Sequence, residues 1–218
     1  KSVTNFKSHL LRTSLDGNEV MASETVRSVL NFVWNALEPL GHPCALIGGL
    51  ALAVWSHPRS TRDIDFLLGI ERGNVDQVLD LLQSQGCRPK SLPAITIVGD
   101  HSFLQLLYTP PGEFYEVQFD FLLAESPFQK LALARSVERE VANLDRPLRV
   151  LKCDDLVLFK LLASRMIDRA DAVILLRENR ESLDTEHLRL WLKNLDLVSE
   201  FHEIWRDAFP AESLPDYC

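Results

Sequence analysis

The sequence predicts an α+β fold, in which a small mixed sheet flanked by helices is followed by a C-terminal helical bundle. Up to about residue 145, short runs with strand-like alternation are interleaved with segments of helical periodicity, whereas after residue 151 only helical periodicity remains. Hydrophobic residues make up 46% of the 218 residues and charged residues 25%, values typical of a chain that folds around a core. Disorder is therefore not expected.

The first half of the chain contains the segments expected to form the sheet. Apolar residues recur at helical spacing from Val26 to Leu37, and Gly41-His42-Pro43 ends this helix. Strand character is clearest where Ile64, Phe66 and Leu68 alternate with their neighbours. Strands are expected at 44–47, 63–68, 94–98, 103–108 and 113–123, and further helices at 50–55, 75–85 and 127–139.

The second half is expected to be helical after one short extended piece at 148–151. Cys153-Asp154-Asp155 suits the N-terminus of a strong helix. Helices are expected at 156–166, 170–177, 185–195 and 198–208. The chain is therefore divided into residues 1–20, a loose N-terminal arm or a segment foreign to the native chain; residues 21–145, the sheet domain; and residues 146–218, a C-terminal helical domain.

The charge distribution limits the classes of partner. A formal net charge of −8 argues against a protein that coats nucleic acid nonspecifically. Between residues 130 and 180, however, basic residues outnumber acidic ones. This bias allows either a local surface for a phosphate-bearing ligand or simply solvated helix faces.

Neither a membrane segment nor a metal-binding cysteine motif is visible. No apolar run approaches the roughly 20 residues that a membrane-spanning helix needs. The four cysteines are scattered without CxxC spacing, so we expect reduced thiols in a cytoplasmic protein, although the sequence leaves a disulfide open.

Asp63 and Asp65 stand in a segment with strand character, which is an unusual place for two acids. Residues two apart on a strand point to the same face, so their negative charges repel, the more so in apolar surroundings. Two explanations are open: a polar strand face exposed to solvent, or a divalent cation held between the carboxylates. Hard carboxylate oxygens are the ligands that Mg²⁺ prefers.

Gly48 and Gly49 lie between the apolar strand at 44–47 and the helix-forming segment that follows. A glycine turn at a helix start presents backbone N–H groups to a phosphate, although any tight strand-to-helix turn can use glycines. A glycine pair followed thirteen residues later by Asp-x-Asp is more specific. It places a phosphate cradle and a metal site within one strand–helix–strand unit.

The motif consists of Ile47-Gly48-Gly49, thirteen further residues and then Asp63-Ile64-Asp65. This arrangement resembles the signature of the nucleotidyltransferase superfamily, which has the DNA polymerase β-like fold. The text "RSTRDID" around the acids is similar to that of AbiEii-type and other minimal nucleotidyltransferases. The resemblance implies that Asp63 and Asp65 are catalytic metal ligands and that Gly48, Gly49, Arg59 and Thr61 bind the nucleotide.

The same family carries a third carboxylate on a later strand, flanked by hydrophobic residues. Phe119-Asp120-Phe121 matches this pattern, so Asp120 is expected to be catalytic and to bind metal. Glu116 is the rival, because it shares a strand face with Asp120. The hydrophobic flanks favour Asp120.

Related proteins often end their core with a helix of the form Lys-x-x-Ala-x-x-Arg followed by two acids. Lys160, Arg165, Asp168 and Asp171 fill similar positions here, with one residue fewer between Ala163 and the arginine. Lys160 is expected to bind nucleotide phosphate, or else to extend to solvent from its apolar segment. Arg165 and the two acids have the spacing of ordinary surface ion pairs.

The resemblance implies a metal-dependent enzyme that moves a nucleoside monophosphate from a nucleoside triphosphate to a hydroxyl acceptor. One or two Mg²⁺ ions are the expected cofactor, with Mn²⁺ as an alternative. The acceptor is expected to be RNA or protein, as for a toxin, with an antitoxin or other protein as a further partner. A small-molecule acceptor of the aminoglycoside type and a non-catalytic nucleotide-binding module are the alternatives.

Overall fold

The computed structural model describes residues 23–55 and 61–215, and it has the mixed α/β architecture that the sequence predicts. Its helices are α1 (Glu24–Leu37), α2 (Gly48–Val54), α3 (Val75–Ser84), α4 (Pro127–Ala134), α5 (Cys153–Ala163), α6 (Met166–Asn179), α7 (Thr185–Asn194) and α8 (Val198–Ala208). Its strands are β1 (Cys44–Ile47), β2 (Ile64–Leu68), β3 (Arg88–Pro89), β4 (Ile95–Val98), β5 (His101–Tyr108), β6 (Val117–Leu123), β7 (Val137–Arg139) and β8 (Leu148–Val150). The arm expected at residues 1–20 lies outside the described residues.

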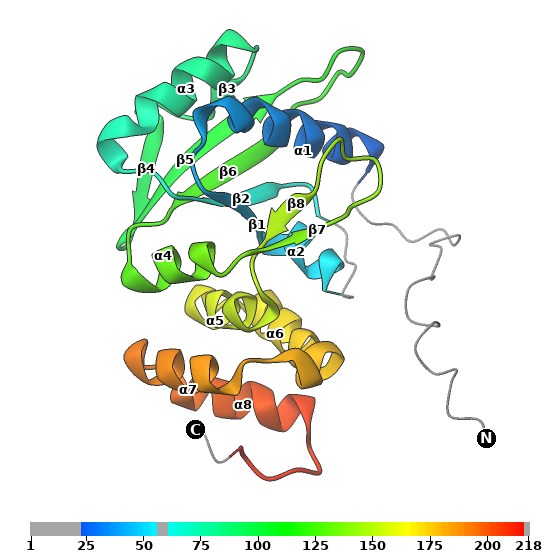
Figure 1. Ribbon diagram of the computed structural model, residues 1–218, viewed down its shortest axis with the longest axis vertical. Coiled ribbons are helices and arrows are strands. Elements are labelled where there is room, and N and C mark those ends of the chain that lie inside the picture. Colours follow the sequence, from blue (N-terminus) through cyan, green and yellow to red (C-terminus); the bar gives the residue numbers. More distant parts are fainter. Residues whose placement is uncertain (1–22, 56–60, 216–218) are drawn as a thin grey trace, which may run out of the picture.

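One mixed sheet forms the centre of the molecule, with strand order β3-β5-β6-β2-β1-β8-β7 and β4 paired to β5. Strand β2 runs antiparallel to β1 and parallel to β6. Helices α1 and α3 cover one face of the sheet, and α4 with the C-terminal helices lies on the other side (Figure 1). Ile64, Phe66 and Leu68 of β2 are fully buried, because this strand lies between two partners and two helical layers.

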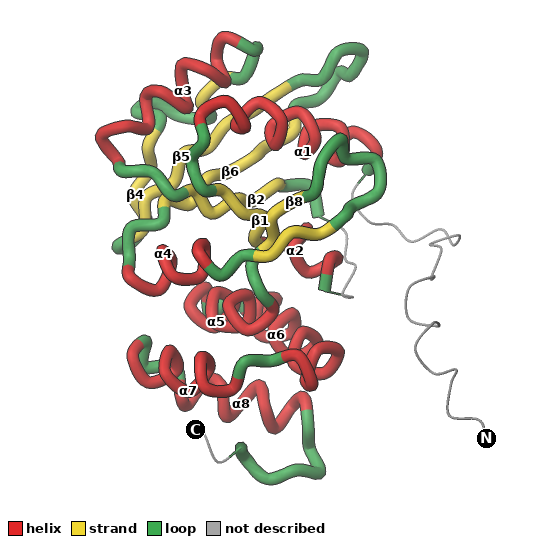
Figure 2. The backbone as a smooth tube through the Cα atoms, in the orientation of Figure 1, coloured by secondary structure: helices red, strands yellow, loops and turns green. Residues whose placement is uncertain are grey.

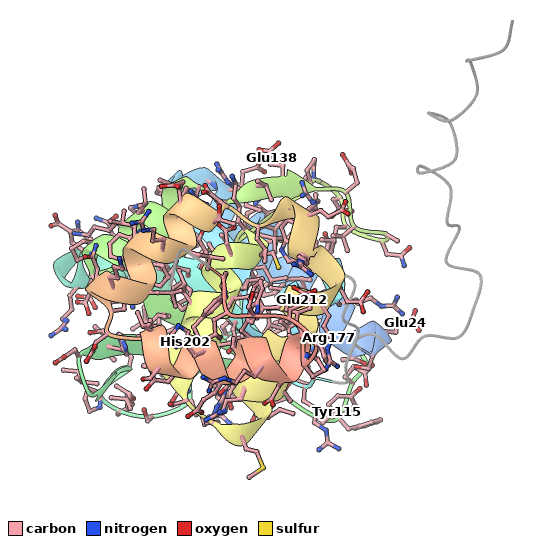
Figure 3. All side chains as sticks on the ribbon, turned by 90° about the horizontal axis from the view of Figure 1, so that it is seen from below. Glu24, Tyr115, Glu138, Arg177, His202 and Glu212 are labelled. Carbon is pink, nitrogen blue, oxygen red and sulfur yellow. The ribbon has the colours of Figure 1, made fainter. Side chains whose placement is uncertain are left out.

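Helices α5 to α8 form the C-terminal bundle and stack below the sheet (Figure 2). Phe201 and Trp205 give α8 an apolar face, and both are buried. Arg177 of α6 donates to the carbonyl of Ala208 at the end of α8 (3.0 Å), and Figure 3 shows this arginine beside α8. None of the helices in the described residues is long and apolar enough to cross a membrane.

Two parts of the sheet differ from the sequence expectation. The helix expected at 127–139 ends at Ala134, and Val137–Arg139 instead forms β7, which pairs with β8. A second short strand, Arg88–Pro89, pairs with β5 and had no sequence signal of its own. Both segments are too short to show a period, so pairing with a distant strand decides their structure.

Strand β8 lies beyond the boundary expected at residue 145, yet it belongs to the sheet. Leu46 of β1 and Val150 of β8 are register partners in a parallel pair. The purely helical part of the chain therefore begins at Cys153. A division into two domains remains a proposal, with the sheet extending through β8.

A buried charge network joins the sheet side to the helical bundle. Arg135, which follows α4, forms ion pairs with Asp154 and Asp155 of α5 and with Asp184 before α7. The Asp155 side chain has no exposed surface, and it also contacts the ring of His187 (2.6 Å). One guanidinium therefore links three helices, and its removal would leave buried carboxylates without their partner.

We expect Arg135→Met to lower the free energy of unfolding by about 3 kcal/mol or more, because removing one member of a buried ion pair leaves the others uncompensated. Urea denaturation measures the change. Arg169→Met is the matched control, since the Arg169–Glu203 pair is 42% and 53% exposed and should contribute at most about 1 kcal/mol. Equal effects of the two substitutions would contradict this role for Arg135.

Candidate active site

The turn between β1 and α2 brings backbone very close to a carboxylate. Gly48 has a φ of +64°, in the left-handed region that glycine adopts without strain. A Cβ at Gly48 would lie 2.0 Å from Oδ2 of Asp65, which is well inside van der Waals contact. A Cβ at Gly49 would lie 3.0 Å from the Cβ of Thr61. Gly48 is therefore required by its positive φ and by its close approach to the acid itself, whereas Gly49 is in tight contact with the Thr61 side chain.

Strand register brings the acids from separate segments together. Ile47 on β1 is the register partner of Asp65 on β2, and Asp65 is in turn the partner of Asp120 on β6. Directly paired residues of neighbouring strands point to the same face, so the two carboxylates lie on one side of the sheet. Asp63 precedes β2 by one residue and completes the group.

These residues line a single cavity of about 470 Å³ between the sheet and the α5–α6 turn. The lining residues are Gly48, Gly49, Thr61, Arg62, Asp63, Asp65, Asp120, Lys160 and Arg165. Seven of the eight site residues expected from the sequence are among them, and the eighth, Arg59, lies outside the described residues. Arg62 and Arg165 are additions that the sequence analysis did not include in the site.

Two acids of the cavity, Asp65 and Asp120, have raised pKa values. Burial, followed by the neighbouring charges of Asp120 and Asp63, raises the pKa of Asp65 from its ordinary value of 3.8 to about 6, against the lowering by Lys160 and Arg165. Burial also raises the pKa of Asp120, partly offset by hydrogen bonds from Gln105 and Gln118. The cavity thus concentrates negative charge that a cation would relieve.

Glu116, the rival of Asp120 in the sequence, lies outside this cavity. Its carboxylate accepts two hydrogen bonds from the guanidinium of Arg88, at 2.7 and 2.5 Å, on the exposed side of the sheet. Because Glu116 is already paired and solvated, it does not add to the charge around Asp65. The geometry favours Asp120 as the third acid.

Lys160 is buried in an ion-pair cluster. Its ammonium lies 2.9 Å from Asp168 and 2.9 Å from Asp171, and neither acid has more than 2% of its side chain exposed. Arg165 also pairs with Asp168, at 2.5 Å, although 70% of the arginine side chain is exposed. The expectation of weak surface pairs was therefore wrong for the two acids, because α6 packs Asp168 and Asp171 inward against Lys160 of α5.

Several basic residues of the stretch at 130–180 form hydrogen bonds or ion pairs within the protein. Arg135 joins the buried network, Arg149 binds Ser136, and Arg177 binds the end of α8. Of this stretch, Lys160 and Arg165 line the cavity. The excess of basic residues thus comprises both internal pairs and exposed side chains.

A divalent metal fits the donor chemistry of the cavity, since Asp63, Asp65 and Asp120 offer hard oxygens and an unrelieved negative charge. Among the described residues, the group whose potential ligand atoms lie within 4.8 Å of one another is a different one: Asp154, Asp155 and His187. That group already has a cation, the guanidinium of Arg135, against both aspartates. Of the two groups, the cavity acids are therefore the better candidates to hold a metal.

The sequence profile of the family described as nucleotidyl transferase AbiEii toxin, of type IV toxin–antitoxin systems, matches residues 32–207. The chain belongs to this family. As an AbiEii-family protein it is a nucleotidyltransferase, and the matched range includes the glycine turn, all three aspartates and the Lys160 cluster. No curated protein matches the chain.

Several solved structures are similar to this chain, and the first supports the nucleotidyltransferase fold. An antigenic nucleotidyltransferase-like protein from Paracoccidioides brasiliensis has a TM-score of 0.50 at 17% identity, over 84% of this chain and 93% of that one. The antibiotic-resistance factor ANT(2'')-Ia has a TM-score of 0.48 at 16% identity, over 81% and 96%. The lincosamide antibiotic adenylyltransferase LnuA has 0.45 at 16%, over 71% and 97%. At these identities the likeness concerns the fold alone.

We expect Asp65→Asn to stabilise the metal-free AbiEii-family protein at neutral pH. The pKa of Asp65 is higher in the folded state than its ordinary value of 3.8, so its contribution to stability is fully present below pH 3.8 and is lost as the pH rises through about 6. A shift of about two units corresponds to roughly 3 kcal/mol at most.

Urea denaturation in the presence of a chelator, at pH 4 and at pH 7.5, measures this difference. The variant should be more stable than the wild type at pH 7.5 and nearly equal at pH 4. A gain of the same size at both pH values would contradict the charge origin of the effect.

Proposed function

We propose that this protein transfers a nucleoside monophosphate from a nucleoside triphosphate to a hydroxyl group of RNA or protein, in a reaction that depends on a divalent metal. The observation that supports the proposal best is the cavity in which Asp63, Asp65 and Asp120 meet the glycine turn. Carboxylates can hold a divalent metal, and the metal in turn binds phosphates. A glycine turn beside them lets the phosphates approach the backbone closely. ATP is the first triphosphate to test.

The triphosphate is expected to lie along the glycine turn. Helix α2 has seven residues, so its dipole is a minor contribution and the main one is close approach to the backbone of Gly48 and Gly49. The exposed side chains of Arg62 and Arg165 are candidates to contact phosphate oxygens directly. Lys160, held by two acids, contributes positive charge from behind the cavity.

Asp63, Asp65 and Asp120 would hold Mg²⁺, one ion or two, with Mn²⁺ as the alternative. When bound, the metal offsets phosphate charge and lowers the pKa of a coordinated hydroxyl. Asp120 would accept the proton of the acceptor hydroxyl. The hydroxyl oxygen then forms a bond to the α-phosphorus, and the bond to the β-phosphate oxygen breaks to release pyrophosphate.

The acceptor is the least determined part of the proposal. Membership of a toxin family supports RNA or protein as acceptor and an antitoxin as partner. Among the described residues, Cys44, Cys87 and Cys153 are free thiols, which fits the proposed cytoplasmic location. A small-molecule acceptor is the alternative. Incubation with each α-labelled triphosphate, Mg²⁺ and cell extract, followed by separation of RNA, protein and small molecules, distinguishes them by where the label appears.

We expect Asp63→Asn to abolish metal-dependent triphosphate binding with little loss of stability, because the change removes one ligand charge from a repulsive group. Calorimetric titration of ATP with and without Mg²⁺ measures the affinity. Asp76→Asn is the control, since Asp76 lies on the exposed side of α3. Unchanged affinity in the Asp63 variant would overturn the metal assignment.

We expect Asp120→Asn to reduce turnover by at least about 100-fold while triphosphate binding largely survives, since the loss of a general base costs about 100- to 10,000-fold. Glu116→Gln should have a small effect, because Glu116 pairs with Arg88 away from the cavity. Labelled transfer into cell extract measures turnover. The reverse pattern would show that Glu116 is the third acid.

A further inference from the structure

Asp120 is surrounded by hydrogen-bond donors on the side away from Asp65. Strand β6 lies between β2, which carries Asp65, and β5, which carries Gln105. The side-chain amide of Gln105 donates to Oδ2 of Asp120 at 2.7 Å. The side-chain amide of Gln118, two residues earlier on β6, lies 2.9 Å from Oδ1 and 3.0 Å from Oδ2. Two amides thus hold one carboxylate.

Lys90 determines which way the amide of Gln118 faces. Lys90 follows β3, and its backbone N–H donates to the carbonyl of Gln105 (2.9 Å), which fixes it beside β5. Its ammonium reaches across β5 and donates to Oε1 of Gln118 at 2.8 Å. An ammonium can only donate, so the amide oxygen must face Lys90 and the amide NH₂ must face Asp120.

These contacts restrict the orientation of the carboxylate. An ionised carboxylate has about four lone-pair positions on its two oxygens, and the amides of Gln105 and Gln118 occupy positions on the β5 side. The same carboxylate lines the cavity together with Asp63 and Asp65. Without the amides, the side chain could rotate away from the reacting group.

We propose that Lys90, Gln105 and Gln118 are positioning residues, which hold the Asp120 carboxylate in the orientation needed for transfer to the acceptor. This inference rests on the proposed function. Lys90, Gln105 and Gln118 do not line the cavity, so they act through Asp120. A misplacement of about 1 Å at a reacting group costs on the order of 100-fold in rate.

The neighbouring cross-strand pair provides a matched comparison. Arg88 reaches across β5 to Glu116 in the same way as Lys90 reaches Gln118. Each member of the Arg88–Glu116 pair lies two residues before its counterpart in the Lys90–Gln118 pair. The Arg88–Glu116 pair does not contact Asp120. If such pairs only stabilised the fold, removal of either pair would have the same effect on transfer. If the function is to position Asp120, only loss of the Lys90–Gln118 pair lowers the rate.

The kinetic test uses the full chain, α-labelled ATP, Mg²⁺ and cell extract as the source of acceptor. Gln118→Leu, Gln105→Leu and Lys90→Met should each lower kcat by about 10- to 100-fold and leave the KM for triphosphate within about twofold. Lys90→Arg should restore most of the rate, because it keeps the donor. The double variant Arg88→Met/Glu116→Gln should retain full rate, since it removes the neighbouring pair as a whole. Unchanged kcat in folded Gln118→Leu, or an equal loss in the double variant, would overturn the proposal.

A second measurement does not depend on activity. The side-chain amide signals of Gln118 in a ¹H–¹⁵N spectrum, assigned by their loss in Gln118→Leu, should move in Lys90→Met and stay close to the wild type in Lys90→Arg. Signals unaffected by Lys90→Met would overturn the proposed orientation. If the wild type transfers no label at all, the proposed function fails, and these spectra still decide whether Lys90 orients the amide.

Discussion

The close approach of the Gly48 backbone to the Asp65 carboxylate is the constraint on which the rest of the site depends. Antiparallel pairing of β1 and β2 sets Ile47 opposite Asp65, so the chain must turn at the next residue, directly over the acid. Only glycine fits, because any Cβ would overlap Asp65 and φ is positive. The turn and the acids are therefore one structural unit, and whatever binds the acids also meets the backbone of the turn.

Concentrated negative charge is the energetic consequence. Burial in apolar strands, and then the charges of Asp120 and Asp63, disfavour the ionised form of Asp65, as its raised pKa indicates. The protein offsets this charge with cations that come from far along the chain, Lys160 and Arg165. Those cations are fixed in place by Asp168 and Asp171, so the α5–α6 turn is a preorganised wall of the cavity.

The helical bundle is therefore part of the site. Arg135 joins the end of α4 to α5 and to the start of α7, which fixes the orientation of α5 below the sheet. Because α5 carries Lys160, the buried network around Arg135 indirectly determines where positive charge meets the acids. In this AbiEii-family protein, stability of the bundle and electrostatics of the cavity depend on the same packing.

The sequence alone determined those features whose signals are local. Gly48-Gly49 and Asp63-x-Asp65 form a motif of fixed spacing. In Phe119-Asp120-Phe121, apolar residues alternate with one acid, which is the pattern of a buried strand that carries a single acidic side chain. The helices of the bundle were predictable because their periodicity extends over several turns. Of the site, the acids, the glycines, Thr61 and Lys160 could be expected in advance, and they line one cavity.

Tertiary structure decided what depends on partners distant in sequence. Strand register, which single-sequence patterns do not specify, sets Asp120 beside Asp65, whereas Glu116 forms an ion pair with Arg88. The same is true of β7, where pairing with β8 prevails over helical composition. The amides around Asp120 and the burial of Lys160 between two acids arise from contacts between strands and between helices. The sequence specifies the chemistry of each side chain, but the charges that surround it depend on how distant segments pack.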